Sequence, residues 1–246
     1  MTSRRPPLRA RARSSSTRPP TPLGTVLPAE LLAEIAAFAD RHNLVVISDE
    51  AYDQITFSHA ATSIAALASP DRVVSCFTFS KTYAMTGWRV GYLVAPATLA
   101  PIVQKLQEPI ISCVNAASQQ AAIAALRDPQ DGVAEMVAAY RRHTLMSVLD
   151  QSEATYALPE GAFYAWVSLA GYPGSSREFS RHLLAERSVA VAPGSAFGPS
   201  GESWVRLSLA TDQEQLLEGA SRLLDFLASA RKDRRCPTET PTLHGL

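Results

Sequence analysis

Cysteine is scarce in this sequence, and no apolar run is long enough to cross a membrane. Its three cysteines lie far apart without a C-x-x-C spacing, which argues against a disulfide framework and favours a reducing, cytoplasmic location. The five histidines have no metal-ligand spacing, so we expect no metal site. A bilayer span needs ~20 apolar residues, and the N-terminus also lacks the apolar segment of a secretory signal. The sequence thus predicts neither a membrane protein nor a secreted one.

Acidic residues are absent before Glu30, although the whole chain carries no net charge. The first 18 positions hold six arginines, so a +6 leader is balanced by −6 in the rest of the chain. Residues 1–20 are rich in Arg, Pro and Ser, and we expect them to be disordered. They have no aromatic residue to stack on bases, and their prolines disfavour the amphipathic helix of a transit peptide. We favour an unselected leader over a phosphate-binding arm or a targeting segment, and we expect no nucleic-acid partner.

The first half of the remaining chain predicts an α/β fold. At 246 residues and 46% hydrophobic composition, the chain can bury a sizeable core. Apolar runs at 44–47, 73–79 and 90–94 alternate with helices, which is typical of a mainly parallel sheet. Pro28 suits the start of the first helix, whose apolar stripe is predicted to be Leu31, Leu32, Ile35 and Phe38.

The second half predicts a smaller α+β domain. We expect helices at 97–108, 116–127, 131–150 and 176–187, and strands at 163–167, 189–192 and 204–208. Thr211-x-x-Glu214 has the spacing of a capping box and predicts the start of a last helix. The predicted organisation is a leader at 1–20, a large domain at 21–130, a small domain at 131–230 and a flexible tail at 231–246.

Chemically capable residues follow two of the predicted strands. Ligands of open α/β sheets bind beyond the carboxyl ends of the strands. The first predicted strand is followed by Asp49 and Tyr52, and the second leads into the segment 78–89. Lys81 lies where a lysine can form a Schiff base, and Arg89 can hold a phosphate by bidentate hydrogen bonds. A lysine, an aspartate, an arginine and hydroxyl groups are together what pyridoxal phosphate requires.

Two motifs carry a family resemblance. S-D-E-A-Y at 48–52 and T-F-S-K-T-Y-A-M-T-G-W-R-V-G-Y at 78–92 closely resemble class I/II aminotransferases of the aspartate aminotransferase fold type. The resemblance extends from about residue 20 to about residue 226 and includes W-V-R-L-S at 204–208. It implies an α/β fold of the pyridoxal-phosphate transferase type, with an incomplete, mainly parallel large-domain sheet and a smaller C-terminal α+β domain.

The resemblance also implies how pyridoxal 5′-phosphate would be bound. Lys81 is similar to the lysine that forms a Schiff base with the cofactor and moves the substrate α-proton. Asp49 resembles the partner of the pyridine nitrogen, and Tyr52 resembles the phenol that hydrogen-bonds the cofactor's 3-oxygen. Thr78 and Arg89 resemble the ligands of its phosphate.

On the substrate side, Arg206 resembles the arginine that holds the α-carboxylate in a fork geometry that lysine could not reproduce. The implied activity is transfer of an amino group between an amino acid and a 2-oxo acid, and the implied assembly is a homodimer. A carbon–sulfur β-lyase on the same fold is the alternative chemistry.

The sequence departs from the family before its first helix. Family members usually have an Asn-Pro-Thr-Gly turn whose asparagine reaches the cofactor's 3-oxygen, whereas this chain has Thr21-Pro22-Leu23-Gly24. A threonine hydroxyl is shorter, which puts that contact in doubt. Family members are also typically half again as long, and the portion that precedes this turn is missing. The favoured hypothesis is a truncated or mis-started gene product, and an inactive remnant is the alternative to a working enzyme.

Overall fold

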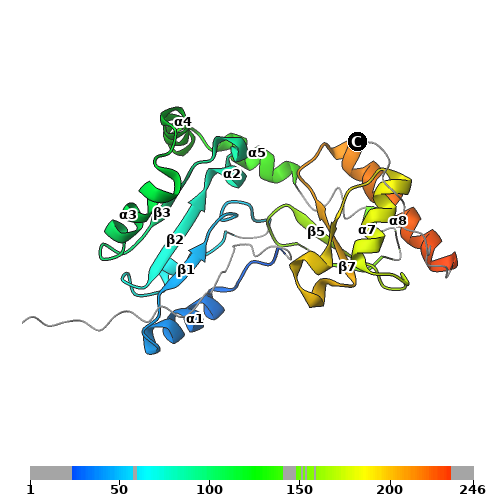
Figure 1. Cartoon of the computed structure of the whole chain (residues 1–246), viewed down its shortest axis with the longest axis horizontal. Helices are drawn as coiled ribbons and strands as arrows, with labels where there is room; N and C mark the ends of the chain where they lie inside the picture. Colours follow the sequence, from blue (N-terminus) through cyan, green and yellow to red (C-terminus); the bar gives the residue numbers. More distant parts are fainter. Residues whose placement is uncertain are drawn as a thin grey trace, which may run out of the picture. The chain divides into compact units, whose positions relative to one another are not determined.

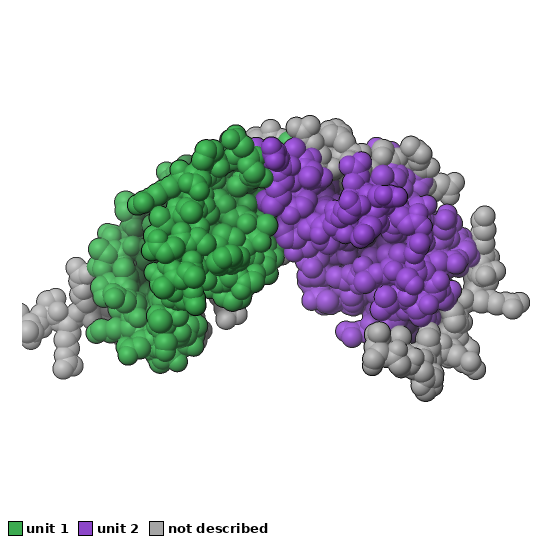
Figure 2. Space-filling model, turned by 90° about the horizontal axis from the view of Figure 1, so that it is seen from above, with its two compact units in different colours: residues 1–20, 26–133 green, residues 21–25, 134–246 purple. Residues whose placement is uncertain are grey.

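The computed structural model describes residues 24–57, 60–140, 148–150, 152, 154–157 and 159–233. These residues belong to two compact units, shown in green and purple in Figure 2. Unit 1 comprises the described residues of 26–133, and unit 2 those of 21–25 and 134–246. The predicted leader at 1–20 and most of the predicted tail lie outside the described residues. No helix of the described ranges has the length and apolar character that a membrane crossing requires.

Unit 1 is built on a three-stranded sheet in the order β1-β2-β3 (Figure 1). Strand β1 (Val46–Asp49) is parallel to β2 (Val73–Thr78), and β3 (Gly91–Val94) is antiparallel to β2. The helices of the unit are α1 (Ala29–Arg41), the single turn α2 (Phe79–Thr82), α3 (Ala100–Ile111), α4 (Ala116–Arg127) and α5 (Asp131–Ala139), which continues past residue 133 into unit 2. Short 3₁₀ turns lie at Ile64–Ala66 and Thr86–Trp88.

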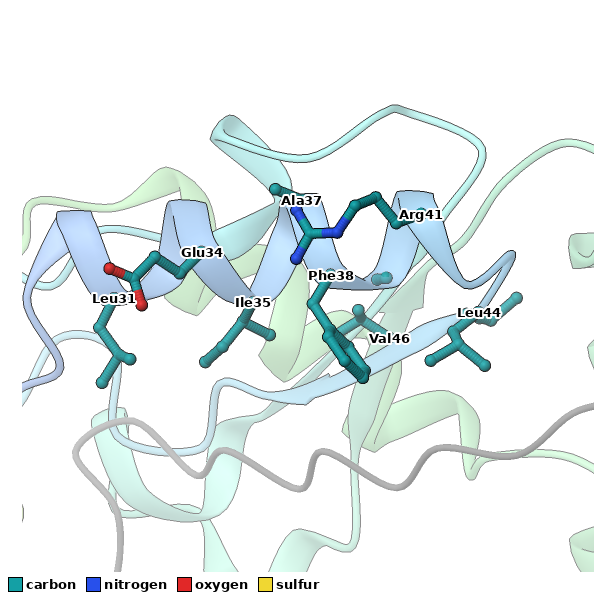
Figure 3. A pocket seen from close by; sticks show the side chains of 10 residues that line it. Leu31, Glu34, Ile35, Ala37, Phe38, Arg41, Leu44 and Val46 are labelled. Carbon is teal, nitrogen blue, oxygen red and sulfur yellow. The ribbon is translucent and has the colours of Figure 1, made fainter.

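Helix α1 packs on the sheet with a face that only partly matches the predicted stripe. Its buried residues are Leu32, Ala36 and Ala39, and the two alanines join a core cluster with residues of β1 and β2, against which Ile35 packs. Leu31 and Phe38, two members of the predicted stripe, are 41% and 49% exposed. The prediction was right for Leu32 and Ile35 and wrong for Leu31 and Phe38 (Figure 3), because the small side chains of Ala36 and Ala39 face the strands instead.

Unit 2 contains a four-stranded antiparallel sheet in the order β4-β5-β7-β6. The strands are β4 (Tyr156–Ala157), β5 (Tyr164–Ser168), β6 (Ala192–Pro193) and β7 (Trp204–Ser208). Helices α7 (Ser176–Arg187) and α8 (Gln213–Asp233) lie together on one side of the sheet (Figure 1). Their contact includes the rings of Phe179 and Phe226, whose centroids are 5.3 Å apart. All five residues of β5 are buried, so this strand lies at the centre of the unit's core.

Two local predictions in unit 2 need correction. The strand predicted at 189–192 begins only at Ala192, where pairing with β7 starts. The cap of α8 is Asp212, whose Oδ1 accepts the backbone N–H of Glu214 at 2.9 Å, so the Thr211 capping box was wrong. The capping box of this unit lies instead at α7, where Ser175 and Glu178 exchange hydrogen bonds with each other's backbone.

Gly24 closes a turn within unit 2. Its φ of +69° is in the left-handed region, and its carbonyl oxygen accepts the N–H groups of Glu160 at 2.9 Å and Gly161 at 2.8 Å. A β-carbon at this position would meet the Gly161 carbonyl oxygen at 2.5 Å. Position 24 therefore requires a glycine. Thr21 and Leu23, which replace the family's asparagine and threonine, and the retained Pro22 lie outside the described residues.

Candidate active site

Strands β1 and β2 end side by side at one edge of the sheet in unit 1. Asp49 is the last residue of β1 and pairs in register with Cys76, and β2 continues from there to Thr78. Thr78 pairs with Gly91, the first residue of the antiparallel strand β3. The segments that follow β1 and β2 and the segment that precedes β3 therefore emerge at the same edge. This is the edge at which ligands of α/β sheets bind.

Lys81 lies on the single helical turn α2, directly after β2. The hydroxyl oxygen of Thr78 caps this turn by accepting the backbone N–H of Ser80 at 3.1 Å. Phe79 anchors the turn because its ring is buried in a cluster with Val90 and Ala122. Lys81 itself is half-buried, and a short, capped and anchored segment limits where its amine can reach.

Tyr52 faces the amine of Lys81 from the segment that follows β1. The Lys81 Nζ atom lies 5.9 Å from the centroid of the Tyr52 ring. The tyrosine side chain is only 5% exposed, so its ring is fixed by the core of unit 1. The structure thus brings together a lysine and a tyrosine that are 29 positions apart in the sequence.

Asp49 is held at the end of β1 by local contacts. Its Oδ1 atom accepts the backbone N–H of Ala51 at 3.1 Å, and the side chain is half-buried. Burial, followed by the nearby charges of Asp49 and Glu50, raises the pKa of the Cys76 thiol on β2. The half-buried carboxylate of Asp49 is therefore close enough to influence the neighbouring strand electrostatically.

Glu50 is a buried acidic residue that sequence reasoning did not single out. It is 2% exposed, and its Oε1 atom accepts the hydroxyls of Ser48 at 2.9 Å and Ser63 at 2.8 Å. Its backbone N–H donates to the Cys76 carbonyl oxygen at 2.8 Å, which extends the β1–β2 pairing past Asp49. The available signal was the Ser-x-Glu alternation, which places both polar side chains on the same face of β1.

A second missed contact joins the two segments that carry Tyr52 and Lys81. The hydroxyl of Thr82 donates to Asp53 Oδ1 at 3.4 Å, so α2 is connected to the segment after β1. Burial and the Asp53 charge raise the pKa of the Tyr83 phenol. Tyr83 also stacks on Phe79, with the ring centroids 5.2 Å apart, so it packs against the residue that anchors α2.

Arg89 precedes β3 in a left-handed backbone conformation, with φ 51° and ψ 47°. One of its guanidinium nitrogens donates to the Thr86 carbonyl oxygen at 2.9 Å, and the side chain is exposed. The arginine lines a hollow of about 690 Å³ that also includes Trp88 and Ser118. Ser118 donates its hydroxyl to the Trp88 carbonyl oxygen at 2.9 Å, which connects the Arg89 segment to α4.

Arg206 belongs to unit 2, whereas the other five predicted site residues belong to unit 1. It lies on β7 and is half-buried. Its guanidinium carbon is 3.9 Å from the centroid of the Tyr164 ring and 4.3 Å from that of Phe197. The guanidinium thus lies over two aromatic rings, within cation–π distance of both.

The chemical capacity of unit 1 follows from this arrangement. An amine, a phenol and a carboxylate, from Lys81, Tyr52 and Asp49, lie at one edge of the sheet together with the cationic Arg89 and the hydroxyl of Thr78. Such a set of side chains can bind a phosphorylated pyridine ring whose nitrogen is protonated. Within the described ranges, no group of three His, Cys, Asp or Glu side chains could hold a metal ion.

Comparison with known proteins establishes the class of the chain. The solved structure of an aromatic aminotransferase from Pyrococcus horikoshii superposes with a TM-score of 0.80 and 38% identity, covering 86% of this chain and 58% of that one. The solved aspartate aminotransferase from Thermotoga maritima gives a TM-score of 0.78 and 37% identity, covering 85% and 55%. The fold is therefore that of the pyridoxal-phosphate-dependent transferases, which confirms the predicted α/β class.

The chain belongs to the family of class I and II aminotransferases, whose model matches residues 17–223. Members of this family use pyridoxal phosphate. The chain is 40% identical over 211 residues to the aspartate aminotransferase of Pyrococcus abyssi. The match covers 83% of this chain and 54% of that relative. The aromatic-amino-acid aminotransferase 2 of Thermococcus litoralis is 39% identical with the same coverage. The family assignment made from the two motifs is confirmed, and the chain spans little more than half the length of these relatives.

Proposed function

We propose that this chain carries the lysine-bearing part of a pyridoxal-phosphate-dependent aminotransferase, and that the whole protein moves an amino group between an amino acid and a 2-oxo acid. The observation that carries this proposal is the meeting of Lys81 and Tyr52 at the strand ends, 5.9 Å from amine to ring centroid, in a member of this family. The proposal is also supported by the capped, anchored turn that holds Lys81.

The residues present fit the cofactor. Lys81 would bind the aldehyde carbon covalently and, once displaced, would take and return the substrate α-proton at Nζ. Asp49 would accept a hydrogen bond from the ring N–H and keep that nitrogen protonated. Tyr52 would donate its phenol hydrogen to the ring's 3-oxygen. When bound, the protonated ring supplies an acceptor for the electron pair that removal of the α-proton releases.

Two further residues of unit 1 suit the phosphate. Thr78 uses an oxygen lone pair to cap α2, which leaves its hydroxyl hydrogen to donate to an anion. Arg89 uses one N–H for the Thr86 carbonyl, and a guanidinium has five N–H donors in all. The pair therefore offers a positive charge and several donors to a phosphate at the end of β2.

Arg206 would bind the substrate α-carboxylate. Contacts with the rings of Tyr164 and Phe197 restrict its guanidinium, and a restricted guanidinium suits bidentate binding of a carboxylate. A lysine in place of Arg206 would retain the positive charge, but it would lose the contacts with the two rings and the ability to donate two parallel hydrogen bonds. We also propose that the whole protein is a cytoplasmic homodimer, as the family resemblance and the scarcity of cysteine favour.

Borohydride reduction tests the lysine directly. The chain is purified with pyridoxal phosphate, reduced and digested, and the cofactor-bearing peptide is located by mass spectrometry. We expect the label on the peptide that contains Lys81, and no label there in Lys81→Ala. Lys105, an exposed lysine of α3, provides the matched control, because Lys105→Ala should leave the label unchanged. Equal labelling of Lys81 and Lys105 would show nonspecific reaction and contradict the proposal.

Product analysis separates the candidate reactions. With aspartate or an aromatic amino acid and 2-oxoglutarate, an aminotransferase forms glutamate and a new 2-oxo acid. A carbon–sulfur β-lyase would instead release ammonia and pyruvate from a cysteine conjugate. A chain that is labelled at Lys81 but forms none of these products would be an inactive part of the enzyme.

A further inference from the structure

The two aromatic rings beside Arg206 are held in different ways. The Tyr164 side chain is buried and belongs to β5, whose residues are all buried. Phe197 is 38% exposed and lies at the end of the 3₁₀ turn η3 (Gly194–Phe197), which follows β6. The core of unit 2 therefore fixes the Tyr164 ring, whereas the position of the Phe197 ring depends on how the backbone of η3 is held.

Ser176, the first residue of α7, holds η3 by two hydrogen bonds. Its hydroxyl donates to the Ser195 hydroxyl oxygen at 2.9 Å and accepts the Ser195 backbone N–H at 3.2 Å. Ser176 is 0% exposed, and hydrogen bonds in a buried environment are stronger than those in water. Because Ser195 lies in η3 two residues before Phe197, the backbone that carries the Phe197 ring is tied to α7.

The same serine is bonded to the segment that leads into β7. Its backbone N–H donates to Glu202 Oε1 at 2.8 Å, and Glu202 precedes the start of β7 at Trp204 by two residues. Ala192, at the end of which strand η3 follows, pairs in register with Arg206 of β7. Ser176 thus connects, at one buried point, the segment that carries Phe197 and the segment that leads to Arg206.

We propose that Ser176 is a positioning residue for the substrate carboxylate. By holding η3, it keeps the Phe197 ring beside the guanidinium of Arg206, 4.3 Å from ring centroid to guanidinium carbon, and limits the orientations of that guanidinium before the carboxylate binds. This inference rests on the proposed function of Arg206 as the carboxylate ligand. A side chain whose orientations are already limited loses less entropy on binding, so the carboxylate binds more tightly.

A purely structural role of Ser176 has different consequences. If its hydrogen bonds only stabilise unit 2, Ser176→Ala lowers the free energy of unfolding and leaves the folded chain's Arg206 as it was. If Ser176 positions Arg206, the substitution also increases the mobility of the guanidinium and weakens carboxylate binding in the folded chain. Measurements on folded variants therefore separate the two roles, and urea denaturation establishes that each variant is folded under the conditions used.

The mobility of Arg206 tests the proposal without cofactor, ligand or turnover. Nitrogen-15 relaxation of its Nε–H group, identified by the loss of that resonance in Arg206→Lys, gives the order parameter of the side chain in the full chain. We expect Ser176→Ala to lower this order parameter, because the Phe197 ring is then no longer held beside the guanidinium. An order parameter that is unchanged in folded Ser176→Ala would overturn the proposal.

Ser180→Ala is the matched control for this substitution. The Ser180 hydroxyl, also on α7, donates to the Ser176 carbonyl oxygen at 2.8 Å, so this variant likewise loses a hydrogen bond of α7 but keeps both bonds between Ser176 and Ser195. It should leave the order parameter of Arg206 unchanged. Equal effects of Ser176→Ala and Ser180→Ala would show a general loosening of α7 and contradict a positioning role.

Succinate, a carboxylate without an amine, tests the consequence for binding. Its dissociation constant is measured by titration followed by NMR. Ser176→Ala should raise this constant by about two- to tenfold, the effect of leaving one long side chain to be ordered on binding. Ser195→Ala retains the backbone N–H bond to Ser176 and should raise the constant less, and Ser180→Ala should not change it.

A double-mutant cycle tests whether Ser176 acts through Phe197. In Phe197→Ala the ring is absent, so adding Ser176→Ala should raise the dissociation constant of succinate no further. If the two substitutions instead have fully additive effects on this constant, Ser176 acts by another route and the proposal is wrong.

Arg206→Ala distinguishes failure of this inference from failure of the proposed function. If Arg206→Ala abolishes succinate binding while Ser176→Ala binds succinate as tightly as Ser180→Ala, Arg206 keeps its proposed role and positioning by Ser176 is wrong. If Arg206→Ala binds succinate as tightly as the unchanged chain, Arg206 is not the carboxylate ligand, and the proposed function of Arg206 and this inference fall together.

Discussion

The α-carbon of Gly91 lies so close to the Phe77 carbonyl oxygen that an added β-carbon would stand 2.5 Å from it. This approach occurs where β3 begins to pair with β2, two residues before α2 begins at Phe79 and four residues before Lys81. Because Gly91 has no side chain, β3 can pair closely with β2, and this pairing aligns the segments that carry Arg89 and Lys81.

Gly91→Ala should therefore destabilise unit 1. Because the clash is with backbone, it cannot be relieved by a rotamer change, and we expect a loss of about 1–3 kcal/mol in the free energy of unfolding. Urea denaturation measures this loss. Gly87 lies in the same motif and has open space around the position of a β-carbon, so Gly87→Ala is the control and should cost little. Similar losses in both variants would contradict the role assigned to the close approach.

Glu50 provides a second prediction about the strand end. Glu50→Ala removes the acceptor of the Ser48 and Ser63 hydroxyls and leaves the Ser48 group buried without it. An unsatisfied buried hydroxyl costs about 1–3 kcal/mol, so urea denaturation should show a loss of at least that order. Glu50→Gln keeps an acceptor oxygen and should lose less. Glu186→Ala, at an exposed position of α7, serves as the control and should leave stability nearly unchanged.

The Cys76 thiol reports the charge at Asp49. Burial and the Asp49 and Glu50 carboxylates raise the pKa of Cys76, so less thiolate is present at a given pH. Because alkylation requires the thiolate, its rate should rise only at higher pH in the folded chain than in the chain unfolded by urea. Asp49→Asn removes one of the charges, lowers the pKa of Cys76 and should shift the rate profile to lower pH.

This measurement uses mass spectrometry of peptides after alkylation at several pH values. Cys113 is exposed and serves as the internal reference for reagent activity. An unchanged Cys76 profile in Asp49→Asn, with Cys113 unchanged as well, would mean that the carboxylate does not act on the thiol.

Local sequence patterns could predict that the candidate residues of unit 1 lie at the ends of strands, because apolar runs directly precede them. Asp49 ends the partly buried strand β1, and Lys81 follows the next strand, so parallel pairing alone brings their segments to one edge. The apolar runs at 44–47 and 73–79 predicted that strands β1 and β2 exist. The roles of these residues nonetheless stay predictions that the experiments above must test.

Features that depend on tertiary partners were less accessible from the sequence. The stripe of α1 was only half right, because Leu31 and Phe38 are apolar without facing the core of unit 1. The aromatic stacking of Arg206 joins residues of β5, β7 and the turn after β6, and no local pattern encodes such a meeting. Thr211 has the spacing of a capping residue, but the chain uses its neighbour Asp212, which suits that role equally well.

Tyr52 yields the sharpest prediction about the cofactor. Its ring is buried and faces Lys81, so Tyr52→Phe retains the ring packing and removes only the phenol oxygen. If the phenol donates to the cofactor's 3-oxygen, its loss removes a hydrogen bond to a charged group, worth about 1.5–3 kcal/mol. The dissociation constant of pyridoxal phosphate should then rise by roughly tenfold or more, as measured by equilibrium dialysis.

Tyr83→Phe is the matched control for this substitution. Tyr83 is a neighbouring tyrosine of unit 1 that stacks on Phe79, and it has no proposed contact with the cofactor. Its replacement should leave the dissociation constant within about twofold, a change of less than 0.5 kcal/mol. Urea denaturation of both variants separates a loss of binding from a loss of folding. If Tyr52→Phe and Tyr83→Phe weaken cofactor binding equally, the phenol of Tyr52 is not a cofactor ligand, and its meeting with Lys81 is a packing contact alone.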